Sequence, residues 1–339
     1  MHRNKIIVVL ILAVCILGCS PESNQEKIYQ KGYIDNNGKL ALVSEYEYTG
    51  DFSQGLAIAV KSEKRGFIDK SGAWAIEPKF EIVGDFKEGA AWVLLLGKRG
   101  YIDMGGNTII DLEYDFVESF SDGMARVMKN GEQWGYINRM GNLQILPKFN
   151  ICGDFKEGFA MVKESGLYGF INKNGDFAIP AKYQQADYFK EGLARIKIDD
   201  KFGFINYDDS LVISAKFDLA ENFSEGLALV RQGTKFGYIG KSGNIDIDLL
   251  YENAESFNNG LARVMQNEAI FYITPKGKKA FDFNYEFGGN FHEDLAWVLK
   301  ENRFGYINKE GQLTIPLKFK EAGDFHENMA KVSFYQEEL

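Results

Sequence analysis

The side chains of this chain that could carry out catalysis are its histidines and its carboxylates. Two of the three histidines, His292 and His326, occupy one equivalent position in two copies of a sequence repeat described below. Other copies have lysine, serine or asparagine there, as expected of a solvent-exposed position. The chain has 48 acidic residues, but no acidic pair stands out from its surroundings. G-x-S-x-G, H-E-x-x-H and phosphate-binding glycine loops do not occur. We therefore expect no catalytic residue, no cofactor and no enzymatic activity.

Metal binding is not expected either. The most suggestive segments have the form Asp/Asn-x-x-Gly, as in Asp69–Gly72 and Asn138–Gly141. Calcium needs a dense set of oxygen ligands, and these segments lack the alternating acidic residues that would supply it. Asp and Asn side chains cap backbone amides in turns, and glycine accepts the left-handed backbone that such turns contain. The pattern therefore indicates turns.

The first residues of the chain have the features of an export signal. Arg3 and Lys5 precede an apolar run from Ile6 to Leu17, which is too short to span a bilayer. The run ends in Ile16-Leu17-Gly18-Cys19, which resembles the lipobox of bacterial lipoprotein signal peptides. The resemblance implies cleavage before Cys19, lipid on that cysteine, and a bacterial cell-envelope protein held on a membrane by its N-terminus. A plain signal peptide is the alternative.

These features divide the chain into three parts. Residues 1–18 are predicted to be the signal peptide, residues 19–30 the lipidated cysteine and a flexible tether, and residues 31–339 a repeat domain. Cys15 would leave with the signal, so Cys152 remains as the one thiol, and no disulfide can form within the mature chain. Cys152 occupies a column of small residues and is expected to be a core residue.

The charge of the chain opposes one class of partner. The formal net charge is −9, and no run of lysine and arginine occurs after the signal segment. Nucleic acids are bound through basic patches that release counterions from the phosphates. We therefore expect no nucleic-acid partner.

The repeat is the main feature of the sequence. Its period is 34 residues, with a single interval of 35, and a fixed period of this length indicates a repeat architecture. The phenylalanine that opens each copy recurs at Phe52, Phe86, Phe120, Phe155, Phe189, Phe223, Phe257, Phe291 and Phe325.

Each copy contains three short β-strand patterns. Alanine follows the phenylalanine by five residues in all copies, with Val or Ile two residues later in nearly all, which predicts a strand with one packed face. A Gly-aromatic-Ile strand follows, as in Gly169-Phe170-Ile171, then an Asp/Asn-x-x-Gly turn and a third strand around an isoleucine such as Ile179. The sequence predicts an all-β chain of about nine three-stranded antiparallel meanders.

This column pattern closely resembles the WG (KWG) repeat family of bacterial proteins. The similarity runs from Lys31 to about Val332, although only Trp134-Gly135 preserves the Trp-Gly pair that gives the family its name. The family has no general activity, so the resemblance implies the architecture alone.

The sequence leaves two arrangements of the repeats open. The repeat domain begins in mid-repeat at Gly32–Asp35 and ends after a first-strand segment at Phe325–Val332, so that the two partial copies add up to one. A terminal strand that completes the first module would close a propeller-like ring, whereas a solenoid stays open. Because three short strands make a thin blade, we slightly prefer an open or incompletely closed array.

One column varies enough to suggest a binding face. It is the residue between the alanine and the valine of the first strand, and its side chains should point away from the face that carries those two residues. It contains the Trp, Met and Arg types that are enriched at binding hot spots, and its two tryptophans could stack on sugar rings. Packing between repeats is the favoured alternative. The candidates are Trp92, Arg126, Met161, Arg195, Arg263 and Trp297, beside Ile58, Leu229 and Lys331.

Together these patterns predict a lipid-anchored envelope protein that presents a repeat surface to a protein or a glycan. A structural or spacer role is the second hypothesis, and an envelope glycan hydrolase is the third and least favoured.

Overall fold

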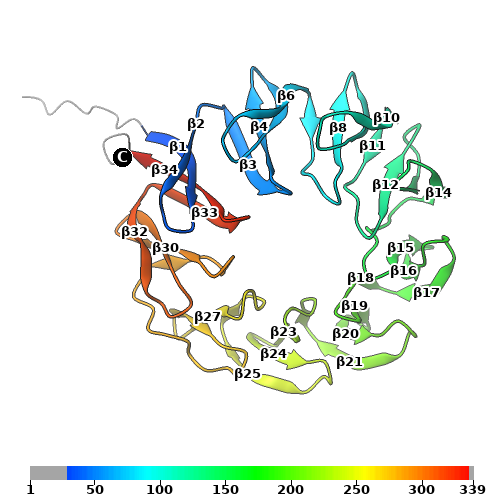
Figure 1. Cartoon of the computed structure of the whole chain (residues 1–339). Helices are drawn as coiled ribbons and strands as arrows, with labels where there is room; N and C mark the ends of the chain where they lie inside the picture. Colours follow the sequence, from blue (N-terminus) through cyan, green and yellow to red (C-terminus); the bar gives the residue numbers. More distant parts are fainter. Residues whose placement is uncertain (1–28, 336–339) are drawn as a thin grey trace, which may run out of the picture.

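The computed structural model describes residues 29–335, so the signal segment, Cys19 and most of the predicted tether lie outside the described residues. Within this range the regular elements are all β-strands, and no helix is long and apolar enough to cross a membrane. The strands form nine antiparallel sheets, which are arranged as blades around a central opening (Figure 1). The all-β repeat prediction is therefore confirmed, and the arrangement is a propeller-like ring.

We number the blades along the chain and give the strands of each blade from the inside outward. Blade 1 contains β3 (Tyr48–Ser53), β4 (Leu56–Lys61), β5 (Lys64–Ile68) and β6 (Trp74–Phe80); blade 2 contains β7 (Ile82–Val83), β8 (Ala91–Leu95), β9 (Lys98–Ile102) and β10 (Thr108–Tyr114); blade 3 contains β11 (Phe116–Val117), β12 (Met124–Met128), β13 (Trp134–Asn138) and β14 (Leu143–Phe149).

The next three blades follow the same order. Blade 4 contains β15 (Ala160–Glu164), β16 (Leu167–Ile171) and β17 (Phe177–Tyr183); blade 5 contains β18 (Gln185–Lys190), β19 (Leu193–Ile198), β20 (Lys201–Ile205) and β21 (Leu211–Phe217); blade 6 contains β22 (Leu219–Ala220), β23 (Leu227–Gln232), β24 (Lys235–Gly240) and β25 (Ile245–Tyr251).

The last three blades include the one that joins the two ends of the chain. Blade 7 contains β26 (Asn253–Ala254), β27 (Ala262–Gln266) and β28 (Ala269–Ile273); blade 8 contains β29 (Phe287–Gly288), β30 (Ala296–Lys300), β31 (Arg303–Ile307) and β32 (Leu313–Phe319); blade 9 contains β33 (Glu321–His326), β34 (Met329–Tyr335), β1 (Tyr29–Asp35) and β2 (Leu40–Ser44).

The ring is closed, so the preference for an open array was wrong. In blade 9, β1 pairs with β34 without irregularity from Tyr29 opposite Tyr335 to Asp35 opposite Met329. The reason is an inner strand that the sequence analysis missed: seven of the nine described sheets have four strands, which makes each blade wider than three strands would. Counted from its phenylalanine, one sequence repeat thus supplies the second, third and outer strands of one blade and the inner strand of the next. The repeat that opens at Phe86, for example, contains β8, β9 and β10 of blade 2 and β11 of blade 3.

The hydrophobic core lies between neighbouring blades. The repeat phenylalanines are buried and pack against the aromatic residue of the preceding blade, as Phe86 does against Phe67 with ring centroids 4.7 Å apart. Where that aromatic is a tyrosine, its hydroxyl donates a hydrogen bond to the next blade, as from Tyr101 Oη to the carbonyl of Glu118 at 2.7 Å. Cys152 is buried, as predicted.

A steric rule explains the Gly-aromatic-Ile strand. A Cβ added at Gly169 would lie 2.5 Å from the carbonyl oxygen of Ile179 in β17, so glycine is needed for the close approach of the outer strand. Blade 7 has Phe271 in place of this glycine, and no outer strand forms there. Residues 279–286 instead fold back over β28, where Phe281 and Phe283 contact Tyr272 with ring centroids 5.4 Å apart.

Candidate functional site

The two histidines lie where the closing blade meets its neighbours. His292 Nε2 of blade 8 is 3.5 Å from Asp324 Oδ2 of blade 9, and His326 Nε2 of blade 9 is 3.9 Å from Asp51 Oδ2 of blade 1. The two imidazole rings are 5.6 Å apart. Among residues 29–335 no group of three or more His, Cys, Asp or Glu side chains is placed to hold a metal ion. The contacts join blades to each other.

A belt of acidic side chains links the turns between the inner two strands of successive blades. Each carboxylate of this belt accepts a hydrogen bond from the backbone N–H of the turn in the next blade, as Glu191 Oε2 does from Gly226 N at 3.0 Å. The belt continues across the closure, where Gly55 N donates to Glu327 Oε2 at 2.8 Å. Its acidic members with such bonds are Glu88, Asp122, Glu157, Glu191, Glu225, Glu293 and Glu327.

The belt carboxylates are occupied by these bonds and by nearby cations. Partial burial of Asp122 acts to raise the pKa of its carboxyl group. Hydrogen bonds from Lys173 and from the backbone N–H of Gly158 outweigh this effect, and the pKa of Asp122 is lowered. Arg139 and Lys241 lie 3.4 Å and 3.2 Å from Glu88 and Glu191. These hydrogen bonds and ion pairs suit the belt carboxylates to holding the ring together.

The two tryptophans of the predicted binding column lie in the seams between blades. The indoles of Trp92 and Trp297 are half-buried and lie against the backbones of Gly84 and Gly289. A Cβ added at Gly84 would lie 2.1 Å from Nε1 of Trp92, and a Cβ added at Gly289 would lie 2.2 Å from Nε1 of Trp297. Each indole therefore has one face covered by its own blade.

The arginines of the column bridge neighbouring blades. Arg126 Nη1 donates to the carbonyl of Cys152 at 2.8 Å while its Nε donates to Asp154 Oδ1 at 2.7 Å, both in blade 4. Arg263 Nη1 of blade 7 donates to the carbonyl of Gly288 in blade 8 at 2.8 Å. Arg195 makes the equivalent bond to the carbonyl of Ala220, and Met161 packs in the seam between blades 4 and 5. These contacts match the alternative of packing between repeats.

Clefts open at several of these seams, and residues of the predicted column form part of their walls. The seam between blades 7 and 8 holds a cleft of about 270 Å³, lined by Arg263, Met265, Ile270 and Phe287 among others. A cleft of about 170 Å³ between blades 4 and 5 includes Met161 and Arg195.

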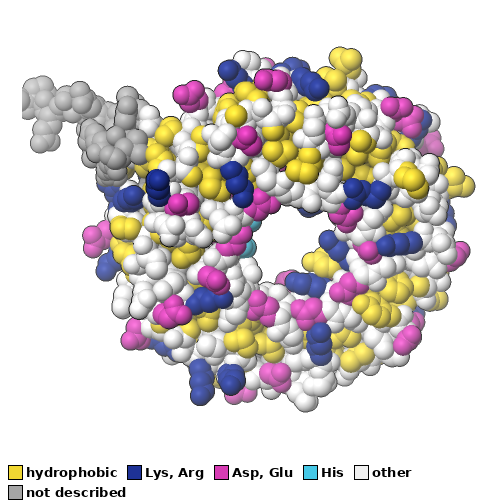
Figure 2. Space-filling model, in the orientation of Figure 1, with side chains coloured by type: hydrophobic (Ala, Val, Ile, Leu, Met, Phe, Trp, Pro, Cys, Tyr) yellow, Lys and Arg dark blue, Asp and Glu magenta, His cyan; other side chains and the backbone are white. Residues whose placement is uncertain are grey.

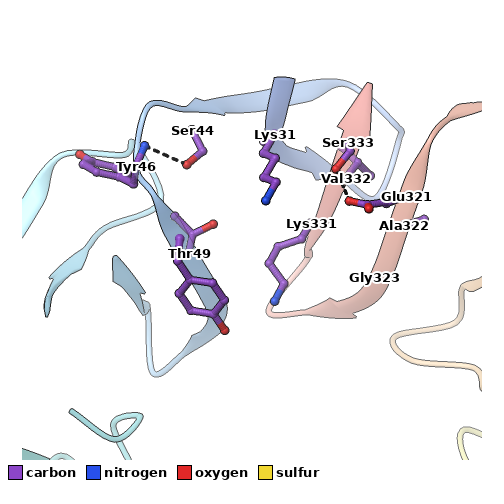
Figure 3. Close-up of a pocket in the computed structure, with 12 residues that line it drawn as sticks. Lys31, Ser44, Tyr46, Thr49, Glu321, Ala322, Gly323, Lys331, Val332 and Ser333 are labelled. Carbon is purple, nitrogen blue, oxygen red and sulfur yellow. Dashed lines mark hydrogen bonds between the residues drawn. The ribbon is translucent and has the colours of Figure 1, made fainter. Parts of the chain in front are cut away.

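The cleft at the closing seam, between blades 9 and 1, has a volume of about 260 Å³. Lys31 and Lys331 extend into it from β1 and β34, and Thr49 of β3 lies on the opposite side (Figure 3). Tyr48, the neighbour of Thr49 in β3, also lines the cleft. On its wall the hydroxyl of Ser333 donates a hydrogen bond to Glu321 Oε2 at 2.6 Å.

A second column, which the sequence analysis missed, exposes large apolar side chains to solvent, and two of its members, Tyr48 and Phe287, line clefts. It lies four residues before the repeat phenylalanine, where the inner strand starts in every blade except blade 4, whose sheet has three strands. Tyr48, Ile82, Phe116 and Ile151 hold it in four consecutive blades and are 55%, 41%, 49% and 45% exposed. Phe287 holds it in blade 8 and is also exposed. We call these five residues the apolar rim.

The face of the ring shown in Figure 2 is chemically mixed. Apolar, acidic and basic side chains are interspersed over it, and both acidic and basic side chains surround the central opening (Figure 2). The sequence signal for the rim was a large apolar residue at a position where three other copies have Gln185, Asn253 and Glu321. The remaining copy has Leu219, which is half-buried. That signal was hidden because an apolar residue next to a strand is usually read as core.

Comparisons with solved structures find similar folds at low sequence identity. The crystal structure of BamB from Moraxella catarrhalis matches with a TM-score of 0.41 and 10% identity over 90% of this chain and 99% of that chain. Hsv2p of Kluyveromyces lactis matches with a TM-score of 0.40 and 9% identity over 78% and 92%. YCF48 bound to D1 peptide matches with a TM-score of 0.34 and 11% identity over 71% and 95%.

A comparison with curated proteins finds no match. The family described as WG containing repeat matches nine consecutive segments from residue 32 to residue 334: 32–64, 66–98, 100–132, 134–168, 168–202, 202–235, 236–268, 270–303 and 304–334. These segments cover nearly all of the described ring. They begin at the third strand of a blade, as 100–132 begins in β9, whereas the repeat counted from its phenylalanine begins just after the inner strand. The chain belongs to the WG repeat family.

Proposed function

We propose that this protein is a non-enzymatic binding scaffold of the bacterial envelope, held on a membrane through lipid at Cys19, and that a protein partner docks on its apolar rim. The observation that supports this most directly is the exposure of Tyr48, Ile82, Phe116 and Ile151 at the same register of four consecutive blades. Large apolar side chains exposed at the same position of neighbouring repeats are typical of interaction surfaces.

The energetics of the rim favour a protein partner. Full burial of one large apolar side chain contributes about 1.5 to 3 kcal/mol, so a half-exposed rim residue can contribute about 1 kcal/mol when a partner covers it. The clefts beside Tyr48 and Phe287 could each receive a protruding side chain of the partner. Aromatic anchors placed beside small pockets are common at the centre of protein interfaces.

The other hypotheses have less support. A glycan site would use exposed aromatic faces for stacking, but Trp92 and Trp297 each have one face against a glycine backbone. A hydrolase would need a free carboxyl group of raised pKa, while the belt carboxylates are engaged in hydrogen bonds and ion pairs. A spacer would need no apolar rim. Of the predicted binding column, Met161, Arg195 and Arg263 would contribute through the cleft walls, and Trp92, Arg126 and Trp297 through the surface that their contacts between blades leave exposed.

The test is a pull-down with Ser20–Leu339 as bait against detergent-solubilised envelope and purified cell-wall glycan. The key variant is Ile82→Asp/Phe116→Asp, and the matched control is Met140→Asp/Leu146→Asp, which places the same charges at two exposed apolar positions outside the rim. We expect the rim variant to bind a captured protein at least tenfold more weakly and the control to bind normally. Equal binding by both variants, or capture of glycan alone, would refute the proposal.

A further inference from the structure

Strand direction places the N-terminal end of the ring and the apolar rim on the same face. Tyr29, at the start of β1, lies opposite Tyr335 at the end of β34. In turn β34 pairs with β33 so that Ser333 lies opposite Glu321, the first residue of that inner strand. Lys320 Nζ, one residue earlier, lies 3.6 Å from the centroid of the Tyr29 ring. The described chain therefore begins beside the start of the inner strand of blade 9.

The rim residues occupy the position of Glu321 in other blades. Because the blades repeat around the ring with the same strand order (Figure 1), all inner strands start on one face, which we call the N-terminal face. The hairpins after the second strand of each blade also lie there, whereas the belt turns and the Asp/Asn-x-x-Gly turns lie on the opposite face. In blade 3, Phe116 lies on the N-terminal face and Met140 on the opposite face.

The length of chain between the predicted lipid and the ring limits how the ring can sit on a membrane. Ten residues from Cys19 to Tyr29 span at most about 33 to 36 Å. Strands of five to seven residues with their turns make the ring roughly 20 Å thick. Turning the opposite face toward the bilayer would use most of that reach to pass around the ring. If the lipid is at Cys19, the ring therefore reaches the bilayer with the least use of the tether when its N-terminal face, with the rim, is turned toward the membrane.

We infer that the partner docking on the apolar rim is a membrane protein of the same bilayer, held between the ring and the lipid by an apolar segment that protrudes from the membrane. The inference rests on the proposed function and on the lipid at Cys19. A protein fits the rim better than lipid does, because separate clefts of about 260 and 270 Å³ at two seams can each receive a protruding side chain, which a flat bilayer surface does not offer. Arg99, whose guanidinium lies 4.9 Å from the Phe116 ring centroid, would also be desolvated under a flat bilayer.

Orientation can be measured directly on vesicles. The full-length lipidated protein, with Cys152→Ala to remove the second thiol, would carry a donor dye at Phe116→Cys or at Met140→Cys. The vesicles would contain phosphatidylethanolamine and phosphatidylglycerol with an acceptor on the headgroups. We expect clearly stronger energy transfer from position 116, because the two positions differ by about one strand length, roughly 17 to 20 Å. Stronger transfer from position 140 would overturn the inference.

The partner class can be tested in cells of the producing bacterium with a photo-crosslinking amino acid at position 116 or 140. We expect position 116 to give an adduct with a protein that resists carbonate extraction, and position 140 to give none. Because tethering raises the local concentration of the partner, Cys19→Ser should reduce the adduct at position 116 at least tenfold. An adduct with lipid alone would assign the rim to the bilayer. An adduct with a soluble protein, unchanged by Cys19→Ser, would overturn the inference but keep the proposed function. Absence of any adduct at position 116 would overturn both.

Discussion

Replacing Gly169 by alanine should detach the outer strand of blade 4 from its neighbour. The added Cβ would lie 2.5 Å from the carbonyl oxygen of Ile179 and 2.6 Å from the amide nitrogen of Ala181. Both are backbone atoms of β17, so no side chain can move to make room. Since ordinary van der Waals contact begins at 3.4 Å, β17 would have to retreat by roughly 0.9 Å (3.4 − 2.5) from β16.

The expected cost follows from this displacement. Overpacking in a well-packed site costs about 1 to 3 kcal/mol. The retreat would also weaken the pairing of Tyr168 with Tyr183 and of Phe170 with Ile179, which flank the glycine. We therefore expect a cost near the upper limit, about 3 kcal/mol, which corresponds to an opening constant for β17 about 100-fold larger than in the parent protein.

Gly153 offers a matched control in the same blade. A Cβ at Gly153 would come no closer than 3.6 Å to a neighbouring atom, and its φ is not in the left-handed region. Gly153→Ala should be neutral or stabilise by up to about 1 kcal/mol through the unfolded chain. Hydrogen exchange of residues 177–183 and urea unfolding would measure both variants. Equal exchange in Gly169→Ala and Gly153→Ala would refute the steric explanation of the Gly-aromatic-Ile strand.

Two further predictions concern the contacts between blades. Glu327→Ala removes the acceptor for Gly55 N at the closing seam and should lower the free energy of unfolding, measured with urea, by about 1 kcal/mol. The control Glu310→Ala, in an exposed turn, should lower it little, and equal losses in the two variants would argue against a stabilising role of the belt. Burial raises the pKa of Tyr101, Tyr136 and Tyr306, so these phenols stay protonated in the fold while the unfolded chain ionises near pH 10. The free energy of unfolding should therefore fall as pH rises above about 10, and Tyr136→Phe should flatten that slope; an unchanged slope would contradict the assignment.

The strands could be predicted because each conserved position of the repeat has a physical cause within the repeat or its direct neighbour. The buried phenylalanines such as Phe155, the alanine five residues later and the Asp/Asn-x-x-Gly turns recur wherever the structure places the same contact. Closure was harder to predict because the inner strand is as short as Ile82–Val83. Two residues cannot display an alternating pattern. The sequence therefore shows only three strands per repeat, which predicts a blade too thin to close.

The candidate site could be predicted only in part, because alternation along a strand identifies a face without saying what covers it. The side chains of Arg126 and Arg263 do point away from the alanine and valine face, but that second face meets the next blade. The rim residues are also apolar, yet Tyr48 and Phe116 are exposed because they stand in the inner strand at the edge of the sheet, where no further strand follows. The exposure of a repeat position depends on how neighbouring blades pack in the ring. It therefore cannot be predicted from the sequence pattern of one repeat.

Blade 7 shows how a departure from the repeat becomes informative once the physical reason for a column is known. The sequence shows that Phe271 replaces the glycine of the other copies, but the sequence alone gives no structural consequence of this replacement. The structure shows that this glycine admits the carbonyl of the outer strand at a distance where no Cβ fits. A benzyl group at that position must therefore exclude the strand, and residues 279–286 pack over Tyr272 through Phe281 and Phe283 instead. Because the seams on both sides keep their aromatic contacts, Tyr238 with Phe257 and Tyr272 with Phe291, the ring closes with a blade that lacks its outer strand.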